Sequence, residues 1–561
     1  LFNNGGTLSI EGATIDGNSA TGDAGSGGGI FNNGGVLTVA SSTVSNNTAA
    51  RAGGGLEDRA VETATTVNLS AVDFTGNSVT GIDDGMGTIS AGNGGAVHIS
   101  GNGSFTASGG TVSGNTAFAE GGGFWNGSGT MTLIGVTVDG NAAEGDDATN
   151  GGGGLFNEGG VISMDDATVI SNNTALGTAG SGGGIFNNDG RIVAVGTTIT
   201  GNTANRAGGG IEDKILNSTP SADMPSVRLT AVTLDGNGAG TDNTGAVLAT
   251  ANPGNGGGLH ITGPGYVLVS NGTVSGNFAA LEGGGLWNNT APSTIGVSGT
   301  VFDGNIANGV TSDSVAVAGG GALFNKGGVM AVSNATITNN MAAGDPGGSG
   351  GGILNQGGQL AVTATTFTGN TAVRAGGALE DRSVEGESTV NLLDVTMDAN
   401  AVGPTPGNGG AVHVTGENST VTIDRSLVSN NTAANEGGGL WNFDNSVMQV
   451  YNSTVFANEA SGTDGGGLFN RPNANTTLLN VTVASNSAAG NGGGVFVSDT
   501  STVAATNTLI GDNSAMAGAD VFGTVDGGGY NLVEDTSDAT INGPSNITGQ
   551  DPALDSEGLQ A

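Results

Sequence analysis

Apolar and polar residues alternate in short runs along almost the whole chain. Val36-Leu37-Thr38-Val39 and Ala331-Val332-Ser333 are typical of these runs. A period of two over four to six residues indicates a strand with one buried face. Thr and Val dominate the runs, as strand propensity favours, and no stretch combines a helical period with helix caps. The pattern predicts an all-β chain whose repeating unit is two or three short strands joined by turns.

Two short phrases recur between these runs. The first is two or three Gly, an aliphatic or aromatic pair and usually Asn, as at residues 27–32 and 182–187. The second follows about twenty residues later and ends in Asn. Its seventeen copies end at Asn18, Asn47, Asn77, Asn115, Asn141, Asn173, Asn202, Asn237, Asn277, Asn305, Asn340, Asn370, Asn400, Asn431, Asn458, Asn486 and Asn513. The commonest step is 26 to 31 residues, and longer steps are typical of loop insertions.

Strands this short are stable only when copies stack, because stacking lets each backbone group pair with the coil above and below. Inward Val, Ile, Leu and Phe side chains then form continuous columns. Asn at the same turn of every coil predicts a ladder of side-chain amides, since Asn tolerates a left-handed backbone and its amides bond to each other along the stack. The sequence thus predicts a right-handed parallel β-helix, or β-solenoid, of about seventeen coils.

A longer repeat of five coils overlies the single coil. Segment 51–59 returns at 206–214 and at 374–382, and every His and Trp of the chain recurs with the same five-coil spacing. These residues are His98, His260, His413, Trp125, Trp287 and Trp441. The predicted organisation is a partial coil at 1–21, three modules at 22–177, 178–344 and 345–486, and a final coil with a C-terminal cap at 487–561. A cap is needed because an open end leaves strand edges unpaired.

The repeat resembles the polymorphic outer-membrane protein repeat family and, more broadly, the right-handed parallel β-helix proteins of bacterial cell surfaces. The family's Gly-Gly-Ala-aliphatic tetrad occurs at 94–97, 320–323 and 409–412, and its Phe-x-x-Asn tetrad at 74–77, 302–305 and 367–370. The resemblance covers nearly the whole chain. It implies a surface-exposed or secreted protein that acts in adhesion or structural display.

Composition adds that the surface is strongly acidic. The chain has 49 Asp and Glu against 11 Lys and Arg, a formal net charge of −38. Such a surface repels nucleic acid, because affinity for phosphate backbones depends on Lys and Arg. It attracts divalent cations, so calcium is a candidate ligand, although the nonapeptide calcium repeat does not recur. The acidic loop positions that suggest it are Asp313, Asp345 and Asp146-Asp147 with the nearby Glu144.

The chain contains no Cys, which excludes a disulfide framework and a thiolate metal site. No apolar run approaches the roughly 20 residues needed to cross a bilayer. The chain opens at Leu1 in mid-repeat, so we interpret it as a piece of a longer secreted precursor. We expect a prokaryotic protein that lies outside the cell or on its surface.

The Glu-Asp-Arg/Lys triplets are the most polar repeated feature. Five coils separate successive copies, so they cannot combine into one active site. One interpretation is a repeated docking stripe formed by Glu57, Asp58, Arg59, Glu212, Asp213, Lys214, Glu380, Asp381, Arg382, Trp125, Trp287 and Trp441. The favoured alternative is an exposed ion pair with the upstream Arg51, Arg206 or Arg374, which contributes little stability. The Trp residues fill a Phe position, which favours packing over sugar stacking, and single His residues five coils apart do not make a metal site.

Many parallel β-helices degrade polysaccharides, and the hydrolases among them resemble one another in Gly-His-Gly and Arg-Ile-Lys motifs. Here Ile or Val follows each His, and Arg191-Ile192-Val193 is only a near match. We therefore predict no catalytic residue, no cofactor, and a non-catalytic extracellular structural or adhesive solenoid. Its partners would be other copies of itself in a filament, or a cell-surface receptor or glycan. A polysaccharide lyase or glycoside hydrolase is the alternative. An ice- or mineral-binding surface is a third, against which the long variable loops argue.

Overall fold

The computed structural model describes residues 1–22, 24–60, 65–83, 89–90, 92–242, 244–251, 253–309, 318–404 and 406–554. These residues form an all-β chain without a helix, in which parallel coils stack into a β-solenoid of about 17 turns. The predicted fold class is confirmed. Within the same residues, no helix is long and apolar enough to span a membrane.

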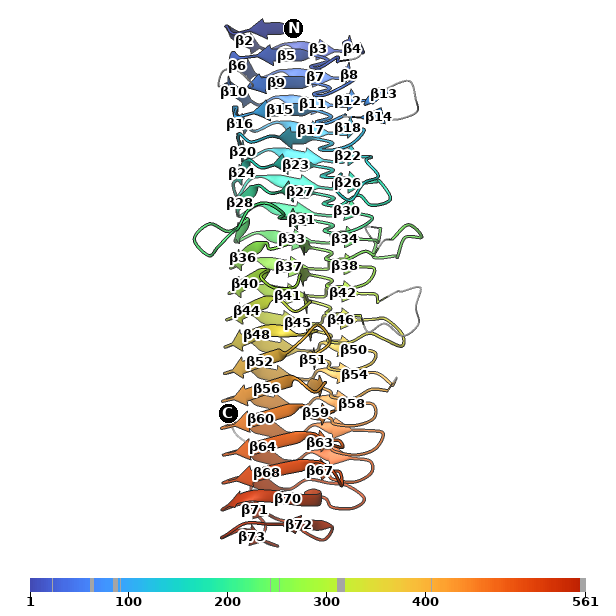
Figure 1. The fold of residues 1–561 in the computed structure, drawn as a ribbon, viewed down its shortest axis with the longest axis vertical. Helices are drawn as coiled ribbons and strands as arrows, with labels where there is room; N and C mark the ends of the chain where they lie inside the picture. Colours follow the sequence, from blue (N-terminus) through green and yellow to red (C-terminus); the bar gives the residue numbers. More distant parts are fainter. Residues whose placement is uncertain are drawn as a thin grey trace. The chain divides into compact units, whose positions relative to one another are not determined.

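Each full coil contains four strands, rather than the two or three that the sequence predicts. One coil consists of β27 (Ile185–Asn188), β28 (Arg191–Val195), β29 (Thr198–Thr200) and β30 (Thr203–Ala204), and we call their equivalents in every coil the a, b, c and d strands (Figure 1). Their parallel partners in the next coil are β31 (Ile211–Lys214), β32 (Val227–Thr230), β33 (Thr233–Asp235) and β34 (Gly238–Ala239). A d strand of two residues is too short to produce an alternating pattern, so the sequence does not reveal it.

All four strands contribute apolar side chains to the interior of a coil. In the coil that begins with β27, Ile185, Ile192, Ala194, Ile199 and Ala204 are each at most 2% exposed. The parallel pairing is in register, so each of these residues meets its equivalent in the next coil. Full burial of an Ile side chain stabilises the folded state by about 1.5–3 kcal/mol relative to leaving it exposed. Stacking therefore stabilises strands that are too short to be stable alone.

The predicted Asn ladder is confirmed at the turn between the c and d strands. The backbone N–H and Nδ2 of Asn173 both donate to Oδ1 of Asn202 at 2.9 Å, and Nδ2 also donates to the carbonyl of Val138. The same bonds link the series from Asn18 to Asn277 in one stack. A second series runs from Asn305 to Asn513, whose amide donates to Asp520. The buried amides of this corner thus satisfy each other.

The described chain divides into two compact units. The first comprises Leu1–Ala280, Gly285–Trp287 and Ser293–Ile295, and the second comprises Leu281–Gly284, Asn288–Pro292 and Gly296–Ala561. Each unit is a stack of the same four-stranded coil. The three predicted modules stay a prediction as domains, although their five-coil period reappears in the side chains described below.

Insertions lie at two of the four corners of a coil. The c-to-d turns have two residues, and so do the b-to-c turns with the exception of residues 165–168. The d-to-a connections vary from residues 205–210 before β31 to residues 240–258 before β35 (Leu259–Thr262). The a-to-b connection is longest at residues 215–226, between β31 and β32. The long steps in the sequence are therefore insertions at these two corners, and the outer face of the c strands is uninterrupted.

The last coils are less regular than the rest. They contain β70 (Val521–Gly529), β71 (Leu532–Val533), β72 (Ala539–Ile541) and β73 (Ile547–Thr548). β72 pairs with β70, and β73 pairs with β71. These short strands cover the edges that the preceding coil presents, as the predicted cap requires.

Candidate functional site: a buried Arg, Glu, His and Trp cluster in three copies

The second residue of each a strand lies on the face opposite the core, because successive side chains of a strand alternate. Register places these residues in one column per unit. The column of the first unit contains Phe31, Glu57, His98, Trp125, Phe156, Phe186, Glu212, His260 and Trp287. The column of the second unit contains Phe324, Leu354, Glu380, His413, Trp441, Phe469, Phe496 and Phe522. The order Glu, His, Trp thus occupies three consecutive coils and recurs every five.

Glu212 shows how one cluster is built. It is the second residue of β31 and is fully buried. Arg206, in the d-to-a connection before β31, donates to Oε1 at 3.0 Å and also donates from Nε to the Ser181 hydroxyl at 2.8 Å. In the next coil, His260 Nδ1 lies 2.9 Å from Oε2, and the Thr262 hydroxyl donates to Oε1 at 2.6 Å. Both carboxylate oxygens therefore have partners.

The charges of this cluster determine the protonation of the carboxylate. Burial by itself raises the pKa of Glu212, but His260 and Arg206 outweigh it and hold the pKa at about 2. The same balance of burial against Arg and His lowers the pKa of Glu57 and of Glu380. All three glutamates are therefore carboxylates at neutral pH. Each buried negative charge has Arg and His beside it to compensate it. An unpaired buried charge would instead destabilise the fold strongly.

The other two copies repeat the set of Arg, Glu and His, although Oε2 of Glu57 and of Glu380 forms no hydrogen bond with a described residue. Arg51 donates to Glu57 at 2.9 Å, and His98 Nδ1 lies 2.7 Å from the same carboxylate. In the second unit Arg374 pairs with Glu380, and His413 Nδ1 lies 3.4 Å from Oε1 of that residue.

Each His stacks on the Trp of the following coil. The ring centroids of His98 and Trp125 lie 4.3 Å apart, and those of His413 and Trp441 lie 4.0 Å apart. His260 and Trp287 also stack at 4.3 Å. Trp125 Nε1 donates to Glu120 at 2.9 Å, and Trp441 Nε1 donates to Glu436 at 3.1 Å. Trp287 and Trp441 are at most 5% exposed, so these rings pack inside the protein rather than present a face to solvent.

The expectation of exposed ion pairs is wrong for the glutamates. The predicted Arg partners are correct, but the side chains of Glu57, Glu212 and Glu380 are 0% exposed because the d-to-a connections cover the column. A strand signature of alternating residues marks which side chains face the core. It does not show that a loop covers the other face, and for that reason the sequence did not reveal the burial.

The structure separates the residues of the predicted docking stripe. The Glu residues and the three Trp residues lie in the column, where Trp125 is half-buried and the other two Trp are buried, and Asp58, Asp213 and Asp381 point into the core. The third residue of each triplet returns to the outer side: Arg59 is exposed, Lys214 Nζ lies 6.0 Å from the Phe186 ring, and Arg382 Nε lies 3.5 Å from Glu380. A docking role for these residues stays a prediction.

The core-facing third residue of the a strands forms a second amide series that the sequence analysis missed. Asn126 donates to Asn157, Asn157 donates to Asn187, and Asn187 donates to Oδ1 of Asp213, each at 2.8 Å. Ile261 follows in register, so Asp213 ends the series. The signal was present in the sequence, because these Asn residues close the Gly-rich phrase.

Asp58 and Asp381 end the equivalent series, and each accepts a hydrogen bond at 2.7 Å, from Asn32 and Asn355 respectively. Burial raises the pKa of all three aspartates, to about 7 for Asp213 and about 6 for Asp381, although hydrogen bonds from Ser226 to Asp213 and from Ser388 to Asp381 oppose the rise. The chain thus carries carboxyl groups that titrate near neutral pH inside its core.

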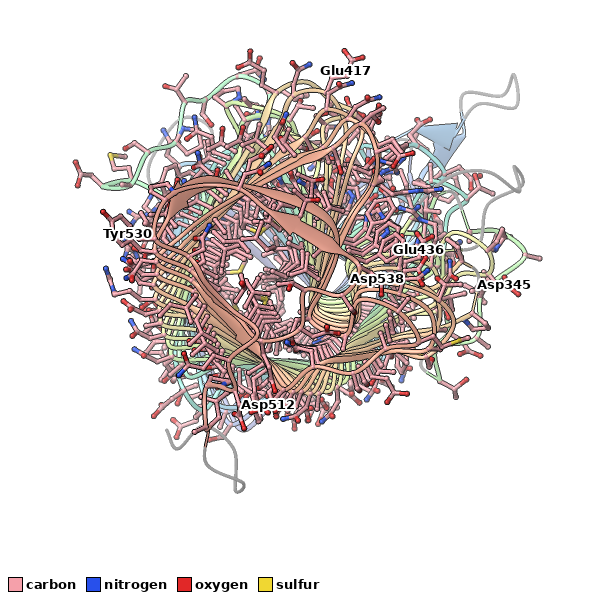
Figure 2. All side chains as sticks on the ribbon, turned by 90° about the horizontal axis from the view of Figure 1, so that it is seen from below. Asp345, Glu417, Glu436, Asp512, Tyr530 and Asp538 are labelled. Atoms are coloured by element: carbon pink, nitrogen blue, oxygen red, sulfur yellow. The ribbon has the colours of Figure 1, made fainter. Side chains whose placement is uncertain are left out.

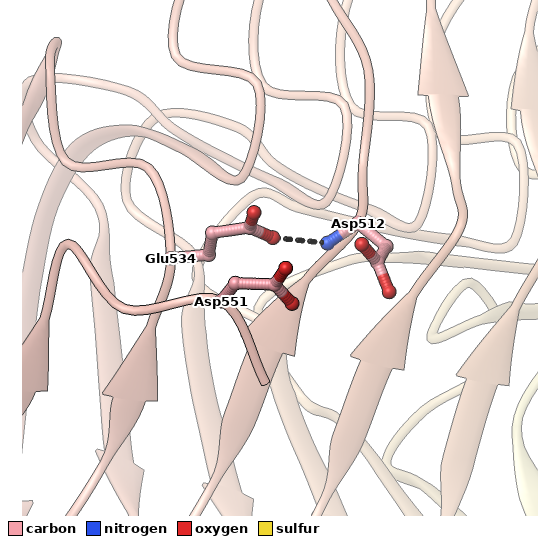
Figure 3. A group of neighbouring side chains, drawn as sticks. All are labelled: Asp512, Glu534 and Asp551. Atoms are coloured by element: carbon pink, nitrogen blue, oxygen red, sulfur yellow. Dashed lines mark hydrogen bonds between the residues drawn. The ribbon is translucent and has the colours of Figure 1, made fainter. Parts of the chain in front are cut away.

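Acidic residues on the surface are mostly dispersed. Asp345, Glu417 and Asp512 point outward at separate positions around the coil (Figure 2). Of the predicted calcium positions, Asp313 lies outside the described residues, and Asp146 accepts hydrogen bonds from Thr178. Among the residues with described side chains, one acidic group brings three ligand atoms within 4.8 Å of one another (Figure 3). Its members are Asp512, Glu534 and Asp551, and Glu534 accepts the backbone N–H of Asp512. Calcium binding stays a prediction.

Stacked parallel coils with interior asparagine ladders define the chain as a β-solenoid repeat protein. No family model matches its sequence, and no curated protein does. The fold is consistent with the β-helix repeat proteins that the sequence resembles. Membership of the polymorphic outer-membrane protein family stays a prediction.

Proposed function

We propose that the chain is a non-catalytic extracellular solenoid that acts in structure or adhesion. The observation that carries this proposal is the burial of the polar residues that recur with each module. The Glu residues that recur with each module are fully buried, and each is paired with Arg and His of its own cluster. A carboxylate with a lowered pKa and no solvent contact has no access to a substrate, so these clusters stabilise the coils rather than perform chemistry.

Recognition in this proposal belongs to the two corners that carry insertions. The d-to-a and a-to-b connections differ in length from coil to coil, whereas the other turns are nearly constant. Binding residues are commonly carried by loops that a rigid scaffold positions. The partners would be a cell-surface receptor or glycan, or further copies of the chain in a filament.

Incubation of the purified chain with glycan arrays, with intact cells and with a panel of polysaccharides tests this proposal. We expect binding without release of new sugar ends. The alternative, a polysaccharide lyase or glycoside hydrolase, would place its acids in the surface groove of about 330 Å³ lined by Glu387 and Glu417. Depolymerisation by the native chain that disappears in the double variant Glu387→Gln/Glu417→Gln would overturn the non-catalytic proposal.

A regular hydroxyl surface favours a second candidate, an ice- or mineral-binding face. In the first unit the third residue of every c strand is Ser, Thr or Asp, and the first residue is Thr in most coils, as in Thr137-Val138-Asp139 and Thr198-Ile199-Thr200. The long loops that argue against such a face lie at other corners. Inhibition of ice recrystallisation, or adsorption to a mineral, should be lost in the variant Thr198→Tyr/Thr233→Tyr if this candidate is correct.

A further inference from the structure

The a-to-b connection after β31 forms one side of an open surface pocket of about 330 Å³. Its floor is the first residues of two neighbouring b strands, Val161 of β24 (Val161–Met164) and Arg191 of β28, which pair in register. Its wall is the connection itself, through Ser218–Ser221 and Met224–Ser226. A cavity of this size matches the lower end of small-molecule sites in proteins.

The wall of the pocket is held in place at both ends. Asp189 accepts the backbone N–H groups of Leu216 and Asn217 at 2.8 Å and of Ser218 at 3.3 Å, and it accepts Nδ2 of Asn217 at 2.7 Å. At the other end the Ser226 hydroxyl donates to the buried Asp213 at 2.6 Å. The pocket therefore exists before any ligand binds, which lowers the entropy cost of binding.

Arg191 lines this pocket together with Asp189, but the guanidinium forms no ion pair with that carboxylate. Five arginines pair with carboxylates within 3.5 Å, namely Arg51, Arg206, Arg374, Arg382 and Arg425, whereas Arg59, Arg228 and Arg471 form no such pair with a described residue. Among the described residues Arg191 has no such partner, and its buried Nε has no hydrogen-bond acceptor. The oxygens of the neighbouring Asp189 already accept four N–H groups of the connection. A buried donor without an acceptor costs free energy.

The chemistry around Arg191 selects an acidic sugar. One guanidinium matches the single charge of a carboxylate, which it binds with two parallel hydrogen bonds. Ser218 and Thr219 add exposed hydroxyls, whereas Met224 and Pro220 add apolar surface. A sugar ring presents both hydroxyls and C–H groups, so it complements a wall of this mixed character. In a chain of net charge −38, such a ligand requires a local cation.

We propose that this pocket, with Arg191 as the carboxylate-binding residue, binds a sugar that carries a carboxylate, such as a uronic acid unit of a cell-surface glycan. The inference rests on the proposed adhesive function and names its ligand class. The positions that correspond to Arg191 in the two flanking five-coil repeats are occupied by Val36 and Gln359. The site therefore occurs at only one of the three equivalent corners.

Calorimetry with a galacturonic acid trimer, and with a neutral galactose trimer as the control ligand, tests the proposal. We expect the native chain to bind the acidic trimer and to bind the neutral one at least tenfold more weakly. Arg191→Gln should weaken acidic-trimer binding at least tenfold while the chain stays folded, since Gln is the residue at the equivalent position 359. Arg425→Gln is the matched control, because it removes the same charge from an exposed site outside the pocket and should leave binding unchanged.

Several outcomes overturn the proposal: no binding of the acidic trimer, equal binding of both trimers, unchanged binding by Arg191→Gln, or preference for a carboxylated peptide over the sugar. The failure of the proposed function gives a different result. If cells or arrayed glycans bind the chain but the acidic trimer does not, adhesion stands and the pocket assignment falls. If the acidic trimer binds and is cleaved, the pocket assignment stands and the non-catalytic function falls.

Discussion

The a-to-b connection is built differently in two regions whose strands correspond residue for residue. In the first unit residues 215–226 form a pocket wall above Arg191. In the second unit residues 383–387 make a shorter connection, Gln359 replaces Arg191, and the nearby groove carries Glu387 and Glu417. The same corner thus carries a cation beside an acid in one region and two acids in the other.

The buried clusters beneath these corners do not differ in this way. Glu212 and Glu380 keep Arg, His and Trp neighbours in both regions. A change in the covered column leaves a buried charge without its partner, whereas a change in loop length costs little because loop-closure entropy grows slowly with length. The comparison indicates that the column maintains the solenoid and that the corners carry what is specific to each repeat.

The largest expected effect is on the column. Glu212→Ala and Glu380→Ala should each lower the free energy of unfolding of the surrounding coils by about 3–5 kcal/mol, because the buried His and the half-buried Arg remain without their carboxylate. Urea unfolding and hydrogen exchange of the affected a strands measure this loss. Glu387→Ala, on the exposed corner, is the control and should change stability by less than about 0.5 kcal/mol. A loss below about 1 kcal/mol in either buried variant would show that the cluster is not structural.

The next effect concerns the aspartates that end the core amide series. The pKa of Asp213 is raised from 3.8 to about 7, so between these values the folded chain keeps a proton that the unfolded chain has released. Stability therefore falls as pH rises from about 4 to about 7, on the order of a few kcal/mol, since one pKa unit corresponds to about 1.4 kcal/mol. For Asp381 the fall should end near pH 6.

Asp213→Asn should remove its part of this pH dependence and stabilise the chain above pH 7. The amide keeps the acceptor for Asn187 and carries no charge. The pKa of Glu212 is lowered to about 2, so its contribution to the free energy of unfolding is lost only as pH falls below about 4.5. That range lies outside the window of Asp213. The unfolding midpoints of the variant and of the native chain should be measured across the pH range. Parallel dependence of the two midpoints on pH would contradict the raised pKa of Asp213.

A smaller effect is expected at the Asn ladder of the c-to-d turn. Asn202→Ala removes the acceptor for two donors of Asn173 and should destabilise the neighbouring coils by about 1–3 kcal/mol. Asn370→Ala in the second unit should cost a similar amount, since it serves Asn340 in the same way. Thermal unfolding of both variants tests whether the two stacks depend equally on this ladder.

The smallest effect on stability should come from exchanging the two corners. Replacement of residues 216–225 by residues 384–388 keeps Ile215 and Ser226 and should change the free energy of unfolding by less than about 1 kcal/mol. The exchange should nevertheless abolish binding of the galacturonic acid trimer, because the pocket wall is gone. Retained binding would place the ligand elsewhere, and unfolding of the chain would show that the connection has a structural role.

The sequence by itself determined the solenoid and its main ladder. The alternation around Val36–Val39 and the seventeen Asn residues predicted stacked parallel coils, because short strands that repeat with a fixed turn residue pair their backbone groups by stacking. The Arg partners of Glu57, Glu212 and Glu380 followed from the copied segment. The two-residue d strands did not, because a pattern needs more residues than they contain.

Only the tertiary structure decided which polar residues are buried and which corner holds a pocket. Glu212 faces away from the core and is buried because a connection covers it, and Arg191 lines a cavity because residues 215–226 fold over the b strands. Both facts depend on the path of a loop, which the alternation of apolar and polar residues does not reveal. Strand register is repeated in every coil and can be inferred from one of them, whereas the path of a loop depends on contacts between residues far apart in the sequence.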